Sequence, residues 1–334
     1  MKAIKFFAIT AMAAAMITSC STDDELSQSN YPSDNIIRVT AGVNNAKTRA
    51  DGQGVSAMEK PFSLTIVNKN AESTELAKKY TYVDKVFSKT SGDWACSETL
   101  LWQDSKTPVD IVAFAPAQEG KFNGVYANGS IQPITYSVAD DQSEKSDNND
   151  LLYYYAKDFN PGTSLVDKKL SIQFNHAFCM IDINVTLGTE FNKPKVLDDS
   201  PIVKVTLDGT KIAANVDVTN AASVVTANEE ATPTTITTTK GTFTKAANAE
   251  ANAKSCFSCI AIPQTVAANT FKVSLMTAGK RYEWTSADPV ELKSGYRYTL
   301  NLSMGNDVVL LKGGSISATP WTEAEISDNT LETE

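Results

Sequence analysis

The chain has 334 residues, of which 42% are hydrophobic and 21% are charged, a composition typical of globular rather than disordered proteins. Its formal net charge of -9 argues against a nucleic-acid partner, because an acidic surface repels phosphate backbones. The single histidine, His176, argues against zinc sites and histidine-dependent catalysis, although it leaves carboxylate chemistry open.

The N-terminus has the pattern of an export signal. Lys2 and Lys5 precede a short apolar run at residues 6–17, which is too short to span about 30 Å of hydrocarbon. Small residues then lead to Cys20 in the sequence ITSC, which has the form of a lipobox. We therefore expect residues 1–20 to be a lipoprotein signal peptide ending at the acylated Cys20, the alternative being an ordinary signal peptide with an incidental cysteine.

Ser21 and Thr22 follow Cys20, and the acidic residues DDE at residues 23–25 come next; this cluster resembles a surface-export signal of lipoproteins. We expect a lipid-anchored precursor in the cell outer membrane, exposed at the surface. Residues 21–35 are polar and are predicted to form a tether. No later apolar run reaches about 18 residues, so the sequence predicts no second membrane span.

The first predicted strand covers residues 36–43. The apolar residues of this segment alternate with others and fall on one face: Ile37, Val39, Ala41 and Val43. A period of two is typical of a half-buried strand. A polar, glycine-containing loop follows at residues 44–54.

Short strand-like segments then recur to the C-terminus, separated by turn residues. They lie at residues 62–67, 80–87, 109–115, 134–138, 151–155, 170–174, 178–187, 202–207, 259–262, 271–277, 296–302 and 308–311. Asp208-Gly209 and Ala278-Gly279 are predicted to be hairpin turns, and residues 71–79 one short helix. Because crossover helices are missing, the pattern predicts an all-β fold of sandwiches, with two domains at residues 36–165 and 166–334.

His176 lies in a segment where the face of the apolar residues changes. Ile172, Phe174 and His176 share one parity, whereas residues from Ile181 onward take the other. Such a flip indicates either a bulge near Met180 or a shift of the strand between two sheets. His176 is expected to point inward as a structural histidine, since no nucleophile motif lies nearby.

Four cysteines follow the lipobox: Cys96, Cys179, Cys256 and Cys259. Cys256 and Cys259 have the CxxC form, but in an extended strand two residues three apart lie on opposite faces, about 10 Å from each other. Buried free thiols are therefore favoured over a redox or zinc site, and the sequence leaves the disulfide pairing open.

Other polar and aromatic clusters have simple structural interpretations. The acidic runs at residues 140–141 and 147–150 are predicted to be solvated loops, and no pair of carboxylates stands out as a catalytic pair. The tyrosines at residues 153–155 are expected to alternate between core and surface rather than to form a sugar-stacking platform. The sequence thus predicts no catalytic residue, no metal site and no cofactor.

Several segments together resemble one family. They are the lipobox ending at Cys20, IIRVTAGV followed by KTRADG, VDIVAFAP, DLLYYYAKDF, LSIQFNHAFCMIDINV, GYRYTLNLSM and ISATPWTE. In this order they are similar to the fimbrillin family of Bacteroides and relatives, the FimA-like and Mfa-like subunits of type V pili. The resemblance implies two tandem transthyretin-like β-sandwich domains and a structural rather than enzymatic function.

The resemblance also implies an assembly mechanism. The lipoprotein precursor is expected to be cut by an extracellular protease after an arginine, and the matching bond is Arg49-Ala50. That cut removes the first strand, whose vacancy a strand of another subunit fills by donor-strand exchange. The expected donor strand carries the apolar residues Val308, Val309, Leu310, Leu311 and Ile316.

The expected partners are other copies of this chain or related fimbrial subunits, the processing protease, and a glycan or protein receptor of host or bacterial origin. A tip adhesin or surface glycan-binding lipoprotein is the alternative function, and a surface hydrolase is a third. An exposed aromatic cluster would favour the adhesin or glycan-binding function, and a pair of converging carboxylates would favour the hydrolase.

Overall fold

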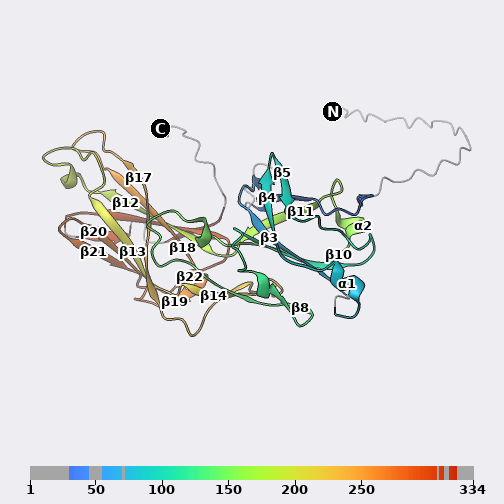
Figure 1. Ribbon diagram of the computed structural model, residues 1–334. Helices are drawn as coiled ribbons and strands as arrows, with labels where there is room; N and C mark the ends of the chain where they lie inside the picture. Colours follow the sequence, from blue (N-terminus) through green and yellow to red (C-terminus); the bar gives the residue numbers. More distant parts are fainter. Residues whose placement is uncertain (1–29, 45–54, 70–71, 307, 312–315, 322–334) are drawn as a thin grey trace, which may run out of the picture.

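The computed structural model describes residues 30–44, 55–69, 72–306, 308–311 and 316–321. Over these ranges the chain is nearly all β. The strands form two lobes that lie side by side (Figure 1). Only short helical segments interrupt them: α1 (Glu75–Lys79), α2 (Pro161–Ser164), η1 (Asn123–Val125), η2 (Asp147–Asn149) and η3 (Thr189–Asn192). The predicted all-β sandwich fold is confirmed.

The first lobe is built on one large sheet. Its strands, in spatial order, are β2 (Val55–Ala57), β1 (Val39–Asn44), β11 (Leu170–His176), β10 (Leu152–Phe159), β6 (Val109–Ala115), β3 (Phe62–Asn68), β4 (Tyr82–Thr90) and β5 (Asp93–Cys96). The ring of Phe62 stacks on Phe87 and meets Trp94 and Phe174 edge-on, with ring centroids 4.9 to 5.5 Å apart. Strands far apart in the sheet thus meet at one ring, so the sheet curls around its own core.

The second lobe packs a mixed sheet against smaller ones. The mixed sheet contains β17 (Thr239–Thr244), β18 (Lys254–Ala261), β12 (Cys179–Leu187), β23 (Tyr296–Met304), β24 (Val309–Leu311) and β25 (Ser317–Pro320). The smaller sheets contain β16 (Thr234–Thr237), β13 (Ile202–Thr210), β20 (Lys272–Thr277) and β21 (Arg281–Thr285); β15 (Val225–Ala227), β14 (Ala213–Val216) and β9 (Ile134–Ser137); and β19 (Gln264–Val266) and β22 (Val290–Leu292). A separate hairpin of β7 (Tyr126–Ala127) and β8 (Ser130–Ile131) lies beside the first lobe, where Tyr126 donates a hydrogen bond to Glu72. Apolar residues alternate along β12 and β23, and the inward set fills the second core.

Two strands of the first sheet contribute to both cores. Along β6, Ile111 and Ala113 face the first core, whereas Val112 and Phe114 pack into the second. Along β10, Tyr154 packs against the first core, and Tyr153 and Tyr155 pack against the second. Burial on both faces explains why residues 111–115, IVAFA, are continuously apolar rather than alternating. The tyrosines are divided between the two cores and form no exposed platform.

The chain passes from one core to the other directly after His176. Phe174 belongs to the first core, and Ala177 and Phe178 belong to the second. β11 pairs with β1 and β10, whereas the next strand, β12, pairs with β18 and β23. The change of apolar parity is therefore a shift between sheets and not a bulge near Met180.

The division of the cores differs from a simple split at residue 166. The strand directly after that position, β11, belongs to the first sheet, and β9, well before it, pairs with β14 of the second lobe. The side chains of Phe122, Tyr136 and Leu151 also pack into the second core. The two-domain organisation stays a prediction. Among the described residues, the last change from the first core to the second lies at residues 176–177.

One predicted turn is wrong. Asp208-Gly209 does not end a strand, because β13 continues through it with a shift of register between Leu207 and Thr210. Gly209 has a φ of +92°, and a Cβ there would lie 2.2 Å from the carbonyl oxygen of Thr270, so the position requires glycine. Ala278-Gly279, by contrast, joins β20 to β21 as a hairpin.

Candidate functional site

The first strand lies inside the sheet rather than at its edge. β1 pairs with β11 in parallel on one side, with Val43 opposite Phe174, and with β2 in antiparallel on the other. Ile37, Val39 and Val43 are each at most 5% exposed and belong to the first core, against which Ala41 is also packed. The four side chains of the predicted removable strand thus face the core together.

The chain just before β1 is fixed by hydrogen bonds to one segment of the first lobe. The Ile37 N–H donates to the carbonyl of Leu100 at 2.9 Å, and the Trp102 N–H donates to the carbonyl of Asn35 at 2.8 Å. Arg38 forms an ion pair with Asp34 at 2.6 Å, and the hydrogen bond from Arg38 lowers the pKa of the Asp34 carboxyl to about 2. This pair lies at the surface, so the apolar contacts carry most of the attachment of the strand.

Three predicted site residues lie outside the described part of the chain. They are Cys20, the expected lipidation site, and Arg49 and Ala50, the expected cleavage site. β1 ends at Asn44 and β2 begins at Val55, so the predicted cleavage bond lies in the connection between these two paired strands.

Three predicted donor residues, Val309, Leu310 and Leu311, form β24, whereas Val308 and Ile316 directly precede β24 and β25. β24 pairs with Leu302–Met304 and β25 pairs with Tyr296–Thr299, both in antiparallel. Val309 is buried, whereas Val308 is 50% and Leu310 is 59% exposed. The four residues of β25 are all exposed. The two strands are therefore held to β23 by backbone hydrogen bonds more than by buried side chains.

The turn between β23 and β24 is held by three side chains. Tyr282 Oη and Lys280 Nζ donate hydrogen bonds to the carbonyl of Asn306 at 2.9 and 2.6 Å. The Asn306 N–H donates to Glu190 Oε1 at 3.0 Å. Because the turn is fixed from two sides, any separation of the C-terminal strands from β23 would begin after it.

The far end of the C-terminal segment is attached where the two cores meet. Trp321 is 7% exposed, and its indole stacks on the ring of His176 with centroids 3.8 Å apart and planes 13° from parallel. The Trp321 N–H donates to the carbonyl of Gly295 at 2.7 Å. Seven residues line the cavity of about 300 Å³ at this point, which we call the junction notch: Asn44, Tyr153, Asn175, His176, Ser294, Gly295 and Trp321.

His176 is held by groups from both lobes. Its Nδ1 lies 2.9 Å from Asp150 Oδ1, an arrangement in which Nδ1–H donates to the carboxylate. Ser294 Oγ donates to the carbonyls of His176 and Ala177 at 3.2 and 2.6 Å. Within the described ranges, the buried Nε2 has no hydrogen-bond partner, and the Ser294 hydroxyl in the same cavity donates to backbone carbonyls instead. The geometry therefore supports the structural interpretation of this histidine.

Sequence reasoning missed both side-chain partners of His176. Asp150 was predicted to be part of a solvated acidic loop, and this is wrong, because Asp150 is only 9% exposed and is bound to His176. The sequence places Trp321 in the C-terminal segment ISATPWTE, at the end of the expected donor region, and predicts no contact for it. Both partners are distant from His176 in sequence, so no periodicity could reveal the contacts. The one hint in the sequence was that His176 stands among apolar residues of the same parity, because a buried histidine needs a hydrogen-bond partner.

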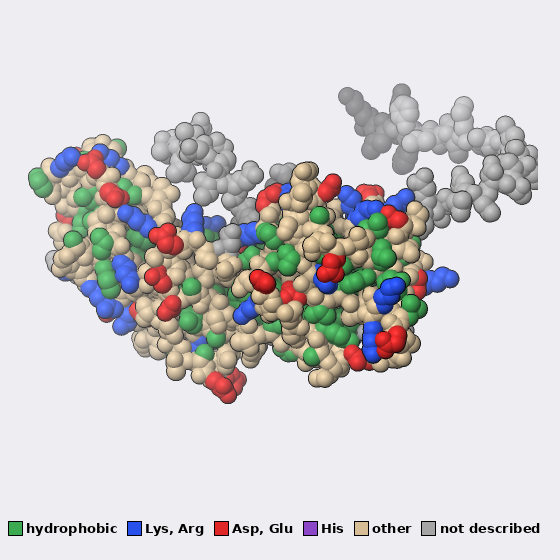
Figure 2. All heavy atoms as spheres, in the orientation of Figure 1, with side chains coloured by type: hydrophobic (Ala, Val, Ile, Leu, Met, Phe, Trp, Pro, Cys, Tyr) green, Lys and Arg blue, Asp and Glu red, His purple; other side chains and the backbone are tan. Residues whose placement is uncertain are grey.

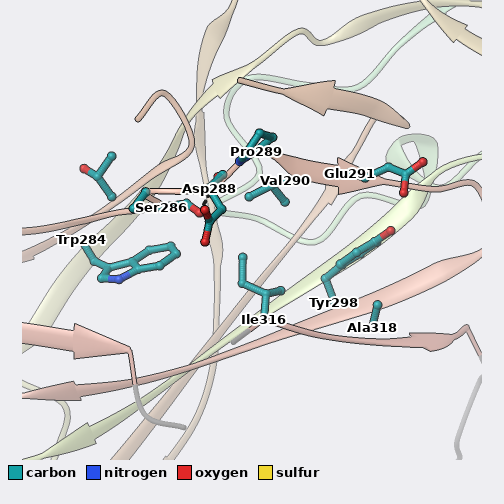
Figure 3. Close-up of a pocket in the computed structure, with 11 residues that line it drawn as sticks. Trp284, Ser286, Asp288, Pro289, Val290, Glu291, Tyr298, Ile316 and Ala318 are labelled. Carbon is teal, nitrogen blue, oxygen red and sulfur yellow. Dashed lines mark hydrogen bonds between the residues drawn. The ribbon is translucent and has the colours of Figure 1, made fainter. Parts of the chain in front are cut away.

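A larger cavity lies beside the C-terminal strands. Its volume is about 540 Å³, and it is lined by the β21–β22 connection, by Tyr298 of β23, and by Ile316 and Ala318 next to and within β25. Figure 3 shows the Trp284 indole and the Tyr298 ring on either side of Ile316, with the Asp288 and Glu291 carboxylates above them. Aromatic faces together with carboxylates are groups that can bind a sugar, through stacking and hydrogen bonds respectively.

The cysteines form no shared site. Cys179 and Cys259 are buried, and burial raises the pKa of the Cys259 thiol to about 12. Cys256 lies on the opposite face of β18 from Cys259, as expected from the strand period. All four cysteines of the described ranges are free thiols, and no group of three or more potential ligands that could hold a metal ion occurs there.

The surface is mixed in charge. Figure 2 shows Lys and Arg side chains interspersed with Asp and Glu over both lobes of the visible face. In the part of the chain that the structure describes, no helix has the length and apolar character needed to cross a membrane.

Comparison with known proteins gives one family and one fold. The model of the fimbrillin-like family matches residues 48–321. A search of curated proteins found no match.

Solved structures share the fold at low identity. A candidate cell adhesion protein from Bacteroides ovatus aligns with a TM-score of 0.61 and 14% identity, covering 87% of this chain and 99% of its own. Another candidate cell adhesion protein, from Bacteroides uniformis, aligns with a TM-score of 0.54 and 14% identity, covering 87% and 100%. A fimbrial protein from Bacteroides vulgatus aligns with a TM-score of 0.52 and 15% identity, covering 86% and 99%.

Proposed function

The chain belongs to the fimbrillin-like family, and from this premise we propose that it is a structural subunit of a type V fimbria. In this proposal it is exported as a lipoprotein anchored through Cys20, cut after Arg49, and polymerised by donor-strand exchange. Fimbrial subunits act by associating with other subunits at the cell surface, and this chain is expected to do the same.

The position of β1 is the observation that supports this proposal best. β1 and the two residues before it place Ile37, Val39 and Val43 in the first core, and the chain that follows carries Arg49. Removal of the strand would expose the apolar surface beneath it and leave backbone groups of β11 without partners. Unpaired strand edges bind further strands, so a strand from another subunit is the natural occupant.

The C-terminal strands are suited to be the donor. Their attachment to β23 buries few side chains, and Leu310 presents an apolar side chain to solvent already. A strand that leaves one subunit to enter the next makes a head-to-tail contact, which grows a fibre instead of a closed ring. Exchange would thus bury in the neighbour the side chains that this chain leaves exposed.

The test is a matched pair of substitutions before the predicted bond. Arg49→Gln is expected to abolish conversion of the monomer into heat-resistant oligomers by an arginine-specific protease, because the bond is no longer recognised. Lys47→Gln, two residues earlier, is expected to leave conversion unchanged. If the wild-type chain is cut after Arg49 and stays monomeric under assembly conditions, the subunit proposal is wrong.

A second candidate function is a tip adhesin or surface glycan-binding lipoprotein. The cavity with Trp284, Tyr298, Asp288 and Glu291 favours it, since it combines aromatic and carboxylate groups. A glycan array probed with the uncut chain and with Trp284→Ala tests it. Binding that the substitution reduces at least about tenfold supports the adhesin, since stacking on an aromatic side chain contributes at this order. Absence of binding removes it.

A further inference from the structure

We propose that the junction notch is the anchor of the C-terminal segment, and that the end of β1 helps to keep it closed. Loss of the first strand would then loosen the C-terminal strands of the same chain. The inference rests on the proposed function, because it says that the first strand controls the release of the donor strand. The contacts of Trp321, His176 and Asn44 support it.

The first step concerns what holds the C-terminal segment in place. Of residues 308–310 and 316–321, whose side chains the structure describes, only Val309 and Trp321 are buried. Val309 lies close to the fixed turn, so Trp321 is the buried side chain at the free end of the segment. Trp321 combines the stack of its indole on His176 with a hydrogen bond from its backbone N–H to the carbonyl of Gly295. Buried aromatic side chains of this kind dominate the energetics of cores and interfaces.

The second step concerns how the notch is built. His176 is the last residue of β11 and lies where the chain passes to the second core. Gly295 comes from the other lobe, and its N–H donates to the carbonyl of Phe178 at 2.9 Å. The indole therefore lies between groups from both lobes, so its position depends on how the end of β11 is held.

The third step connects the notch to β1. Asn44, the last residue of β1, donates from Nδ2 to Oδ1 of Asn175 at 3.0 Å, and Asn175 directly precedes His176. Both asparagines line the junction notch together with Trp321. β1 also supports β11 by backbone pairing up to Phe174. Cleavage after Arg49 removes these contacts at once, so the support on one side of the notch is lost.

The consequence is an order of events. While β1 is present, the C-terminal segment stays on its own chain, and the precursor does not donate a strand. Once β1 has gone, the acceptor groove opens and the donor loosens through the same contacts. Premature assembly before the precursor reaches the surface is thereby disfavoured.

Hydrogen exchange of the uncut full-length chain tests the anchor. Trp321→Ala is expected to raise amide exchange of residues 316–321 by about tenfold or more, because a buried stacked indole contributes at least at this order. Amides of β12 in the same protein serve as the internal control and should not change. Trp321→Phe keeps part of the stack and is expected to give a smaller rise, which guards against a variant that fails to fold. A change of less than about twofold for Trp321→Ala overturns the anchor.

A second matched pair tests the connection to β1. Asn44→Ala removes the hydrogen bond to Asn175 and is expected to raise exchange of residues 316–321 by about two- to tenfold, the range of one hydrogen bond. Thr40→Ala, on the exposed face of the same strand, should leave it unchanged. Equal effects of the two variants overturn the connection. None of these measurements requires polymer, so they can succeed when oligomers fail to form, and the two proposals can fail separately.

Discussion

Removal of the first strand should unfold the first core unless a replacement strand is supplied. The perturbation is a chain that begins at Ala50 and therefore lacks Ile37, Val39 and Val43. Burial of one such side chain contributes about 1.5–3 kcal/mol, so the three together contribute roughly 5–9 kcal/mol. This is an upper estimate, because the unfolded chain already buries part of its apolar surface. A whole domain is stable by only about 5–15 kcal/mol, so the loss is close to the total.

The assay is urea unfolding of the shortened chain at low concentration, with and without a peptide equivalent to residues 36–44. At one hundred times its dissociation constant the peptide should restore about 2.7 kcal/mol of stability. A peptide with Val39→Asp and Val43→Asp is the control, since it keeps the backbone groups but not the apolar face. The reasoning is refuted if the shortened chain is as stable as the full chain without peptide, or if both peptides act alike.

Three further outcomes are expected. Leu310→Ser should reduce oligomer formation after cleavage about tenfold, measured on a gel after heating. It should shift the free energy of unfolding by less than about 0.5 kcal/mol. Val203→Ser, at a comparably exposed site, should change neither quantity. Gly209→Ala should destabilise the chain by more than about 1 kcal/mol in urea unfolding, whereas Gly279→Ala, with open space around it, should not. Because burial raises its pKa, the Cys259 thiol stays protonated at pH 8, and mass spectrometry after alkylation of the native protein should find Cys256 modified well before it; equal rates would contradict the structure.

The sequence predicted the strands whose two faces differ. β12 alternates between buried and partly buried residues, and β23 follows the same period over most of its length, so both could be located from the sequence. β21 escaped prediction because RYEWT is short and mixes charged with aromatic residues on a strand at the edge of its sheet. An alternation with a period of two is visible in a sequence only where one face of the strand is more deeply buried than the other.

The arrangement of the strands was less accessible than their positions. Nothing local in residues 134–138 indicates that β9 pairs with β14, because strand pairing is decided by packing between distant segments. The bulge at Gly209 looked like a turn for a related reason, since Asp-Gly favours positive φ in either setting.

The candidate site was predictable only in its apolar part. The alternating pattern identified the strand whose side chains enter the first core, because burial leaves a trace in the sequence. The contacts of His176 with Asp150 and Trp321 leave no such trace, since each joins residues brought together by the fold alone. The residues of the junction notch therefore needed the structure.

The strands β6 and β10 present one face to each core. Two lobes that share strands in this way are joined through packed sheet and not by a linker alone, so tension applied at one end would pass through the sheet as shear. A filament assembled from such units would be stiff within each unit, and any bending would concentrate at the joints between neighbours.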